Sequence, residues 1–223
     1  KLLPLERAAM PSFFIQNLIS FLNLGMVGFV TASVAVRFVF PAVSLEGPSF
    51  WIIRSAPLTI HDLLWAKFWS SLLPLLVLSE ILIVLSNMLL PVTTFMMWLG
   101  IVTVLMMTFG ITALGVGLGA VFPRFKHENV AQIPTGFGGI AYMIVTMLFI
   151  GTVITLEAWP IYRMFVTISL GGRMAPATLT WVIASFLLVI ILIVIAVIYG
   201  VYWLLRQRAK SSLSSTPAIF TIM

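Results

Sequence analysis

The 223-residue chain contains no cysteine and only two histidines, His61 and His127. Without thiols it can form no disulfide, no iron–sulfur cluster and no thiolate zinc site, and two isolated histidines give no basis for a haem site. The pair His127-Glu128 would offer a metal two ligands that point apart, and the spacing of a zinc protease motif is absent. The sequence therefore predicts neither a metal site nor a cofactor bound by this chain.

Charged residues are scarce as well. They make up 8% of the chain, against 61% hydrophobic residues, whereas an average soluble domain is about 25% charged and roughly half apolar. The 12 Lys and Arg and 6 Asp and Glu are too few to cover a globule of this size unless lipid covers most of its surface. The composition predicts a membrane protein whose main partner is lipid, and it gives no reason to expect a nucleic-acid partner.

Long apolar runs take the place of the missing charges. A helix needs about 20 mostly apolar residues to cross the hydrocarbon layer. Five stretches of the sequence satisfy this requirement: Phe14–Val36, Trp69–Leu89, Met97–Val121, Pro134–Leu156 and Leu179–Leu205. We expect an all-α, polytopic bundle in which residues 1–223 form one transmembrane domain.

The basic residues between these spans predict the orientation. Most of them lie in the segments 41–67, 122–133 and 206–223, which the positive-inside rule places on the cytoplasmic side of a bacterial inner membrane. The C-terminus is then cytoplasmic, and residues 1–12 form an external lead-in. Because residue 1 falls outside, we expect at least one further span upstream.

Two of the connections are predicted to be structured. In the cytoplasmic segment, Gly47-Pro48 can open a short helix that places Phe50 and Trp51 in the interface, and Pro57 should end it. The outer connection 157–177 is too polar to span and too aromatic for a solvated loop. An external interfacial or re-entrant hairpin fits it best.

Glu80 is the only acidic residue well inside a predicted span, where a lone carboxylate costs a few kcal/mol. Asn87 follows seven residues later and therefore lies on the same helix face, with Ser79 and Ser86 one step around. This polar stripe should face the bundle. Two interpretations stay open: the wall of a transport route or a proton site, and an interhelical hydrogen bond that fixes packing.

The glycine-rich stretch around Gly115 and Gly119 lies inside a predicted span and not after a strand, and no P-loop motif occurs in the chain. Glycines four residues apart give helices a flat surface for close approach, so we assign this pair to helix packing. The chain itself is not expected to be an enzyme that hydrolyses ATP.

Several short motifs carry a resemblance to a known family. The first block runs from Arg37 to Gly47 and continues with Phe50-Trp51, 54–58 and 64–67; the second combines 122–125, 128–129 and 131–133. Together they resemble the membrane permease subunit of a family of bacterial ABC exporters, within the wider type-2 ABC permeases.

The resemblance implies a six-helix half-transporter, of which this chain would contain the last five helices. A second permease half and a cytoplasmic ATP-binding subunit would be its partners, with ATP and Mg²⁺ held by that subunit. The implied function is the permease part of an ATP-driven exporter; the alternatives are a secondary carrier that uses Glu80 and a structural subunit of a larger membrane complex. The residues implied to couple to the ATPase are Glu46, Phe50, Trp51, Arg54, Pro57, Lys67, Arg124, Glu128 and Asn129.

Overall fold

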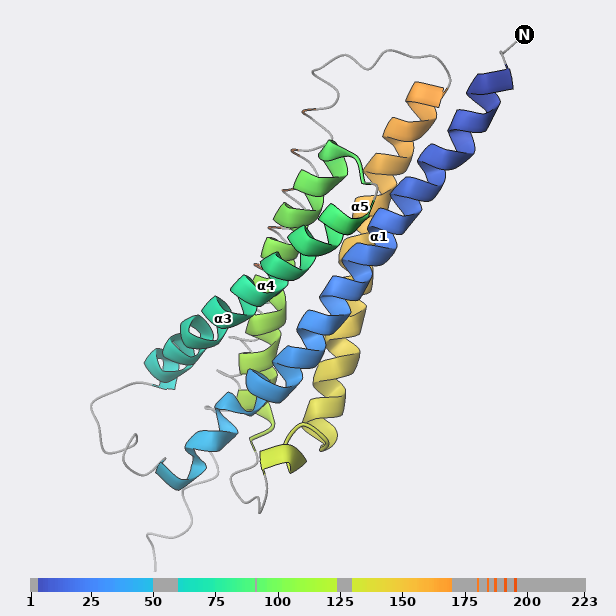
Figure 1. Cartoon of the computed structure of the whole chain (residues 1–223). Coiled ribbons are helices and arrows are strands. Elements are labelled where there is room, and N and C mark those ends of the chain that lie inside the picture. The colour runs from blue at the N-terminus through green and yellow to red at the C-terminus, as the bar shows by residue number, and fades with distance from the viewer. Residues whose placement is uncertain are drawn as a thin grey trace, which may run out of the picture.

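The computed structural model describes residues 4–49, 60–90, 92–123 and 130–169, together with residues 180, 184, 187, 191 and 195. All regular elements in these segments are helical, as predicted (Figure 1). The long helices are α1 (Pro4–Phe38), α3 (Ile60–Leu89), α4 (Thr94–Val121) and α5 (Phe137–Ser169). Three short 3-10 helices, η1 (Phe40–Ala42), η2 (Ser44–Ser49) and η3 (Val130–Gln132), lie in the connections.

Within the described residues, four segments are long and apolar enough to cross a membrane. They are Leu18–Glu46, Asp62–Leu89, Thr94–Val121 and Phe137–Trp159. Each overlaps one of the first four spans predicted from sequence. The fifth predicted span, Leu179–Leu205, lies almost entirely outside the described residues, so it stays a prediction.

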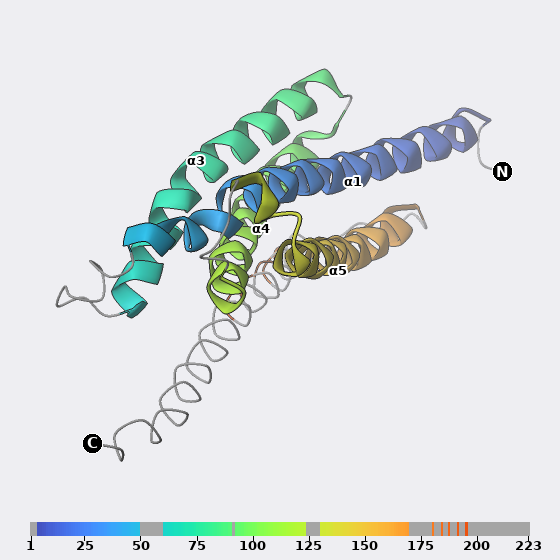
Figure 2. The ribbon, with the colours of Figure 1, turned by 90° about the horizontal axis from the view of Figure 1, so that it is seen from below.

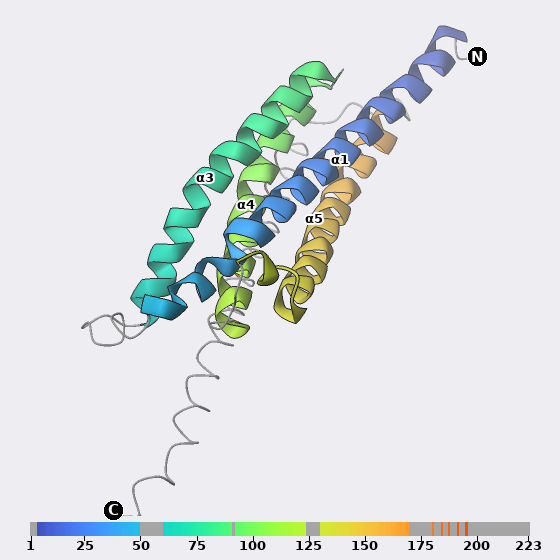
Figure 3. The same ribbon diagram turned by 60° about the horizontal axis from the view of Figure 1, so that its bottom comes forward.

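The four long helices run side by side (Figure 1). Seen from below, α3 and α5 lie on opposite sides of the pair formed by α1 and α4 (Figure 2). Contacts of α1 with α3, α4 and α5, and of α4 with α3 and α5, hold the bundle together. The view in Figure 3 shows η1 and η2 continuing from the end of α1 toward the start of α3. Helices α1 and α4 are therefore the central pair.

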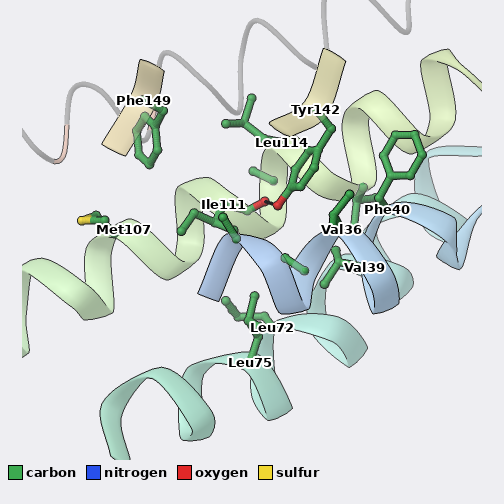
Figure 4. Packing of buried hydrophobic residues seen from close by; sticks show 14 of the residues in the cluster. Val36, Val39, Phe40, Leu72, Leu75, Met107, Ile111, Leu114, Tyr142 and Phe149 are labelled. Atoms are coloured by element: carbon green, nitrogen blue, oxygen red, sulfur yellow. Dashed lines mark hydrogen bonds between the residues drawn. The ribbon is translucent and has the colours of Figure 1, made fainter. Parts of the chain in front are cut away.

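The core of the bundle is built around α4 (Figure 4). Ile111 and Tyr142 are fully buried there, and the Tyr142 hydroxyl donates a hydrogen bond of 3.4 Å to the backbone carbonyl of Ile111. The Tyr142 ring packs against Phe40, with ring centroids 5.8 Å apart. These contacts join α4, α5 and η1 in one apolar cluster.

Glycines allow the close approach of η1 to α4. A Cβ atom at Gly115 would lie 2.8 Å from Cγ1 of Val39, and a Cβ atom at Gly119 would collide with the backbone carbonyl of Phe40. Both glycines are buried. The sequence-based prediction assigned this pair to helix packing, and in the structure the two positions face Val39 and Phe40.

The outer faces of the bundle are apolar. On α3, large side chains such as Leu73, Val77, Ile81, Leu85 and Met88 are exposed by more than half of their surface. A soluble monomer rarely exposes a continuous apolar face of this kind. The exposed side of α3 is therefore suited to contact with lipid chains.

The structure differs from the sequence-based boundaries in two places. Helix α1 begins at Pro4, so most of the predicted lead-in 1–12 is helical. Helix α5 continues to Ser169, so the predicted hairpin does not begin at Glu157. A polar residue was expected to end the span, but the Glu157 carboxylate is buried and hydrogen-bonded within the bundle, which lets the helix continue. Residues 170–177 of that hairpin lie outside the described residues.

Candidate functional site

The first polar cluster inside the bundle joins α1 to α3. Nδ2 of Asn23 donates a hydrogen bond of 3.0 Å to Oδ1 of Asn87, and the Ser86 hydroxyl donates to Oδ1 of Asn23. Asn23 and Asn87 are both buried. Asn23 therefore satisfies polar groups of two neighbouring residues of α3 from the facing helix.

The second cluster joins α4 to α5. The hydroxyl of Thr103 donates a hydrogen bond of 2.8 Å to Oε1 of Glu157. Thr103 is 0% and Glu157 is 1% exposed, so this carboxyl group is fully enclosed by protein. Its other oxygen, Oε2, is buried and has no hydrogen-bond partner among the described residues. Polar groups in an apolar interior usually have partners, so a carboxyl group with one unpartnered oxygen is unusual among the residues that the structure describes.

The two clusters meet at a small cavity to which all four long helices contribute. Ser20 and Leu24 come from α1, Asn87 from α3, Gly100 from α4 and Glu157 from α5. Asn87 lies near the end of α3 and Gly100 near the start of α4, on either side of the turn that joins these helices. At that turn the Thr93 side chain caps α4 by accepting a hydrogen bond of 3.3 Å from the Met96 amide.

Glu80 and Asn87 were expected to form one polar stripe, and the structure gives them different surroundings. Asn87 is buried and bonded to α1, whereas Glu80 is half-buried and makes no hydrogen bond to a described residue, its Oε1 being enclosed without a partner. Ser79, the residue before Glu80, is buried, and its hydroxyl oxygen lies 2.8 Å from that of Thr108 on α4. The inward part of the stripe thus consists of Ser79 and Asn87.

An ion pair joins two elements at the opposite end of the bundle. The Lys67 ammonium group pairs with the Glu46 carboxylate, joining η2 to the first turns of α3. Both side chains are about three-quarters buried. The other residues proposed from the resemblance lie outside the described residues: Phe50, Trp51, Arg54, Pro57, Arg124, Glu128 and Asn129.

Sequence reasoning missed Glu157 and Asn23. Glu157 was assigned to an external hairpin because it follows the fourth predicted span directly. A signal for its position was available in the sequence, because the apolar segment Phe137–Trp159 includes Glu157. Asn23 lies in the middle of the first predicted span, and its polarity alone marked it as a partner for another buried polar group.

No group of three or more His, Cys, Asp or Glu side chains that could hold a metal ion occurs in the described segments. The polar clusters are built from amides, hydroxyls and single carboxylates. Their chemistry is that of hydrogen bonding between helices.

The fold defines an all-helical protein with four helices, among its described residues, that are long and apolar enough to cross a membrane. Residues 3–209 match a protein family described as "Putative ATP-binding cassette", and the chain belongs to this family. No curated protein and no solved structure matches the chain.

The family corrects the more specific identification made from short motifs. An ATP-binding cassette family points to an ATPase-type domain and not to a permease subunit, so the assignment to an exporter permease, and the function inferred from it, are wrong. The secondary carrier and the structural subunit are not better supported. The motifs lay mostly in short loops, whereas the family match extends over nearly the whole chain.

Proposed function

We propose that this chain is a membrane-embedded component of an ATP-binding cassette transporter. One observation carries the proposal: the family match over residues 3–209 includes all four long helices that the structure describes. The region that this chain shares with its family is thus the helical bundle itself. Its apolar outer faces and its polar links between helices are typical of a bundle that works in lipid.

We further propose that ATP and Mg²⁺ are bound by another, ATP-binding subunit of the transporter. A P-loop needs a glycine-rich turn whose free backbone amides surround the phosphates, followed by Lys and Ser or Thr. No such motif occurs in the sequence. The glycines at 115, 117 and 119 are buried within α4, where their amides lie inside a helix. The buried position of these glycines supports a packing role for α4 within the helical bundle.

Photolabelling tests both parts of the proposal. Membranes that contain the tagged full chain are irradiated with 8-azido-ATP and Mg²⁺, solubilised in mild detergent and purified through the tag. We expect label on a co-purifying polypeptide, suppressed by excess ATP, and none on the chain itself. Specific label on this chain would contradict the proposed division of labour. Absence of any labelled, co-purifying polypeptide would contradict membership in a transporter complex.

We also propose a bacterial inner-membrane location with a cytoplasmic C-terminus and a fifth span at 179–205. The absence of native cysteine allows single-cysteine labelling. Leu45, an exposed residue of η2, and Ser211 are changed to Cys separately and treated with a membrane-impermeant maleimide in intact cells and in inverted vesicles. Both should react only in inverted vesicles. Reaction of the two positions from opposite sides would rule out the fifth span.

A further inference from the structure

Two buried polar atoms without partners lie at the same small cavity. They are Nδ2 of Asn87 on α3 and Oε2 of Glu157 on α5. The two residues are 6% and 1% exposed, so bulk water does not satisfy these atoms. Leaving a buried polar group without a partner is energetically costly, and two such groups beside one cavity indicate a shared ligand.

The size of the cavity limits what that ligand can be. It leaves about 10 Å³ for the centre of a water-sized molecule. This is close to the roughly 10–15 Å³ that one buried water requires. An organic molecule does not fit, and one water does.

The chemistry of the two groups favours a neutral ligand that both donates and accepts. Nδ2 of Asn87 is a hydrogen-bond donor, which disfavours a cation, and the Glu157 carboxyl group disfavours an anion. Water can accept from the amide and exchange a hydrogen bond with either protonation state of the carboxyl group. Both groups are held in place, since Asn23 binds Oδ1 of Asn87 and Thr103 binds Oε1 of Glu157.

We propose that this cavity binds one structural water, which accepts a hydrogen bond from Nδ2 of Asn87 and bridges to Oε2 of Glu157. The water joins the two polar clusters into one chain of hydrogen bonds through Ser86, Asn23, Asn87, Glu157 and Thr103. That chain contains residues from α1, α3, α4 and α5. The inference concerns the bundle itself and holds independently of the proposed function.

Gly100 on α4 allows a test, because Gly100→Ala should change the melting temperature in opposite directions for an empty and for a hydrated cavity. An added Cβ at Gly100 would lie 3.4 Å from Nδ2 of Asn87 and 3.6 Å from Cγ1 of Ile83, an ordinary packing distance. In an empty cavity, Gly100→Ala improves packing and helix propensity, and the melting temperature rises. In a hydrated cavity, the methyl group displaces the water and the melting temperature falls.

The experiment measures thermal unfolding of the purified full chain in detergent, with Gly151→Ala as the matched control. Gly151 is on α5, is exposed, and has no atom within 4 Å of an added Cβ, so this variant reports helix propensity alone. We expect Gly151→Ala to raise the melting temperature slightly and Gly100→Ala to lower it by several degrees. A rise for Gly100→Ala that equals or exceeds that of the control would overturn the proposal.

The same substitution in a Glu157→Leu variant distinguishes two causes of destabilisation, loss of the water and steric strain. In Glu157→Leu the bridging partner is absent, while the contact between an added Cβ and Asn87 is unchanged. If Gly100→Ala acts by displacing the water, its penalty should largely disappear in this background. If Gly100→Ala lowers the melting temperature just as much in this variant, the cause is strain against Asn87, and the proposed water site is wrong. An experimental structure with density for one water between the two side chains would be the direct confirmation.

Discussion

Thr103 of α4 donates a hydrogen bond of 2.8 Å to Glu157 of α5, and neither side chain has appreciable contact with solvent. This contact places an ionisable group inside a predominantly apolar bundle. It also explains why α5 does not end at Glu157, because the carboxyl group is accommodated by the neighbouring helix. The stability of the bundle should therefore depend on this hydroxyl.

Thr103→Val tests that dependence. The substitution keeps the shape of the side chain and removes the donor, leaving the buried carboxyl group without its partner. We expect the variant to lose about 1–2 kcal/mol of unfolding free energy, measured by reversible denaturation in mixed micelles. Thr152→Val is the control, because the exposed Thr152 hydroxyl bonds only to the Leu148 carbonyl of its own helix. An equal loss in both variants would show that the Glu157 contact contributes nothing.

The contact between Asn23 and Asn87 should show coupling in a double-mutant cycle. Each change to Ala removes the same interhelical hydrogen bond and leaves the other amide buried. We expect Asn23→Ala and Asn87→Ala together to cost about 0.5–1 kcal/mol less than the sum of the single variants. Strict additivity in the same unfolding assay would contradict a direct energetic link between α1 and α3.

Gly119 should be intolerant of any side chain. An added Cβ collides with the backbone carbonyl of Phe40, which cannot rotate away as a flexible side chain could. We expect Gly119→Ala to destabilise the bundle by about 1–3 kcal/mol, as overpacked cores do. Thermal unfolding in detergent measures the change, with Gly151→Ala as the unhindered control. A neutral result at Gly119 would mean that η1 packs less closely against α4 than described.

The pair of Glu46 and Lys67 should respond to charge exchange. Both side chains keep about a quarter of their surface exposed, so solvent screens the pair. We expect each single reversal, Glu46→Lys or Lys67→Glu, to cost about 0.2–1 kcal/mol, with partial recovery in the double reversal. The recovery should shrink as salt is added to the unfolding assay. Failure of the double variant to recover at low salt would count against an ion pair between η2 and α3.

Spin labels on α3 can check which of its faces meets lipid. Ile81 is 60% exposed and Ile83 is 1% exposed, although they lie two residues apart. A label at Ile81→Cys should collide readily with dissolved oxygen in liposomes and poorly with a water-soluble nickel reagent. A label at Ile83→Cys should be shielded from both. Preferential nickel access at Ile81 would place that face against water.

The pattern of apolar runs predicted the first four spans because every backbone group in a bilayer must be paired internally, which leaves long apolar helices as the solution for such sequences. Apolar runs predicted the end of a span poorly where a polar residue inside the span is hydrogen-bonded to another helix. Glu157 interrupts the apolar pattern, but its partner Thr103 lies on another helix, far away in sequence. Local reasoning therefore ended the span too early.

The sequence by itself thus determined the helical class, four membrane-length segments, the absence of a P-loop and the lack of thiol chemistry, since these depend on composition and local spacing. Only the tertiary structure decided which polar groups meet. Asn87 is hydrogen-bonded to Asn23, and Asn87 and Glu157 line one cavity. Glu80 makes no hydrogen bond to a residue that the structure describes. The physical reason is that a buried polar group needs a partner, and in this bundle the partners come from different helices.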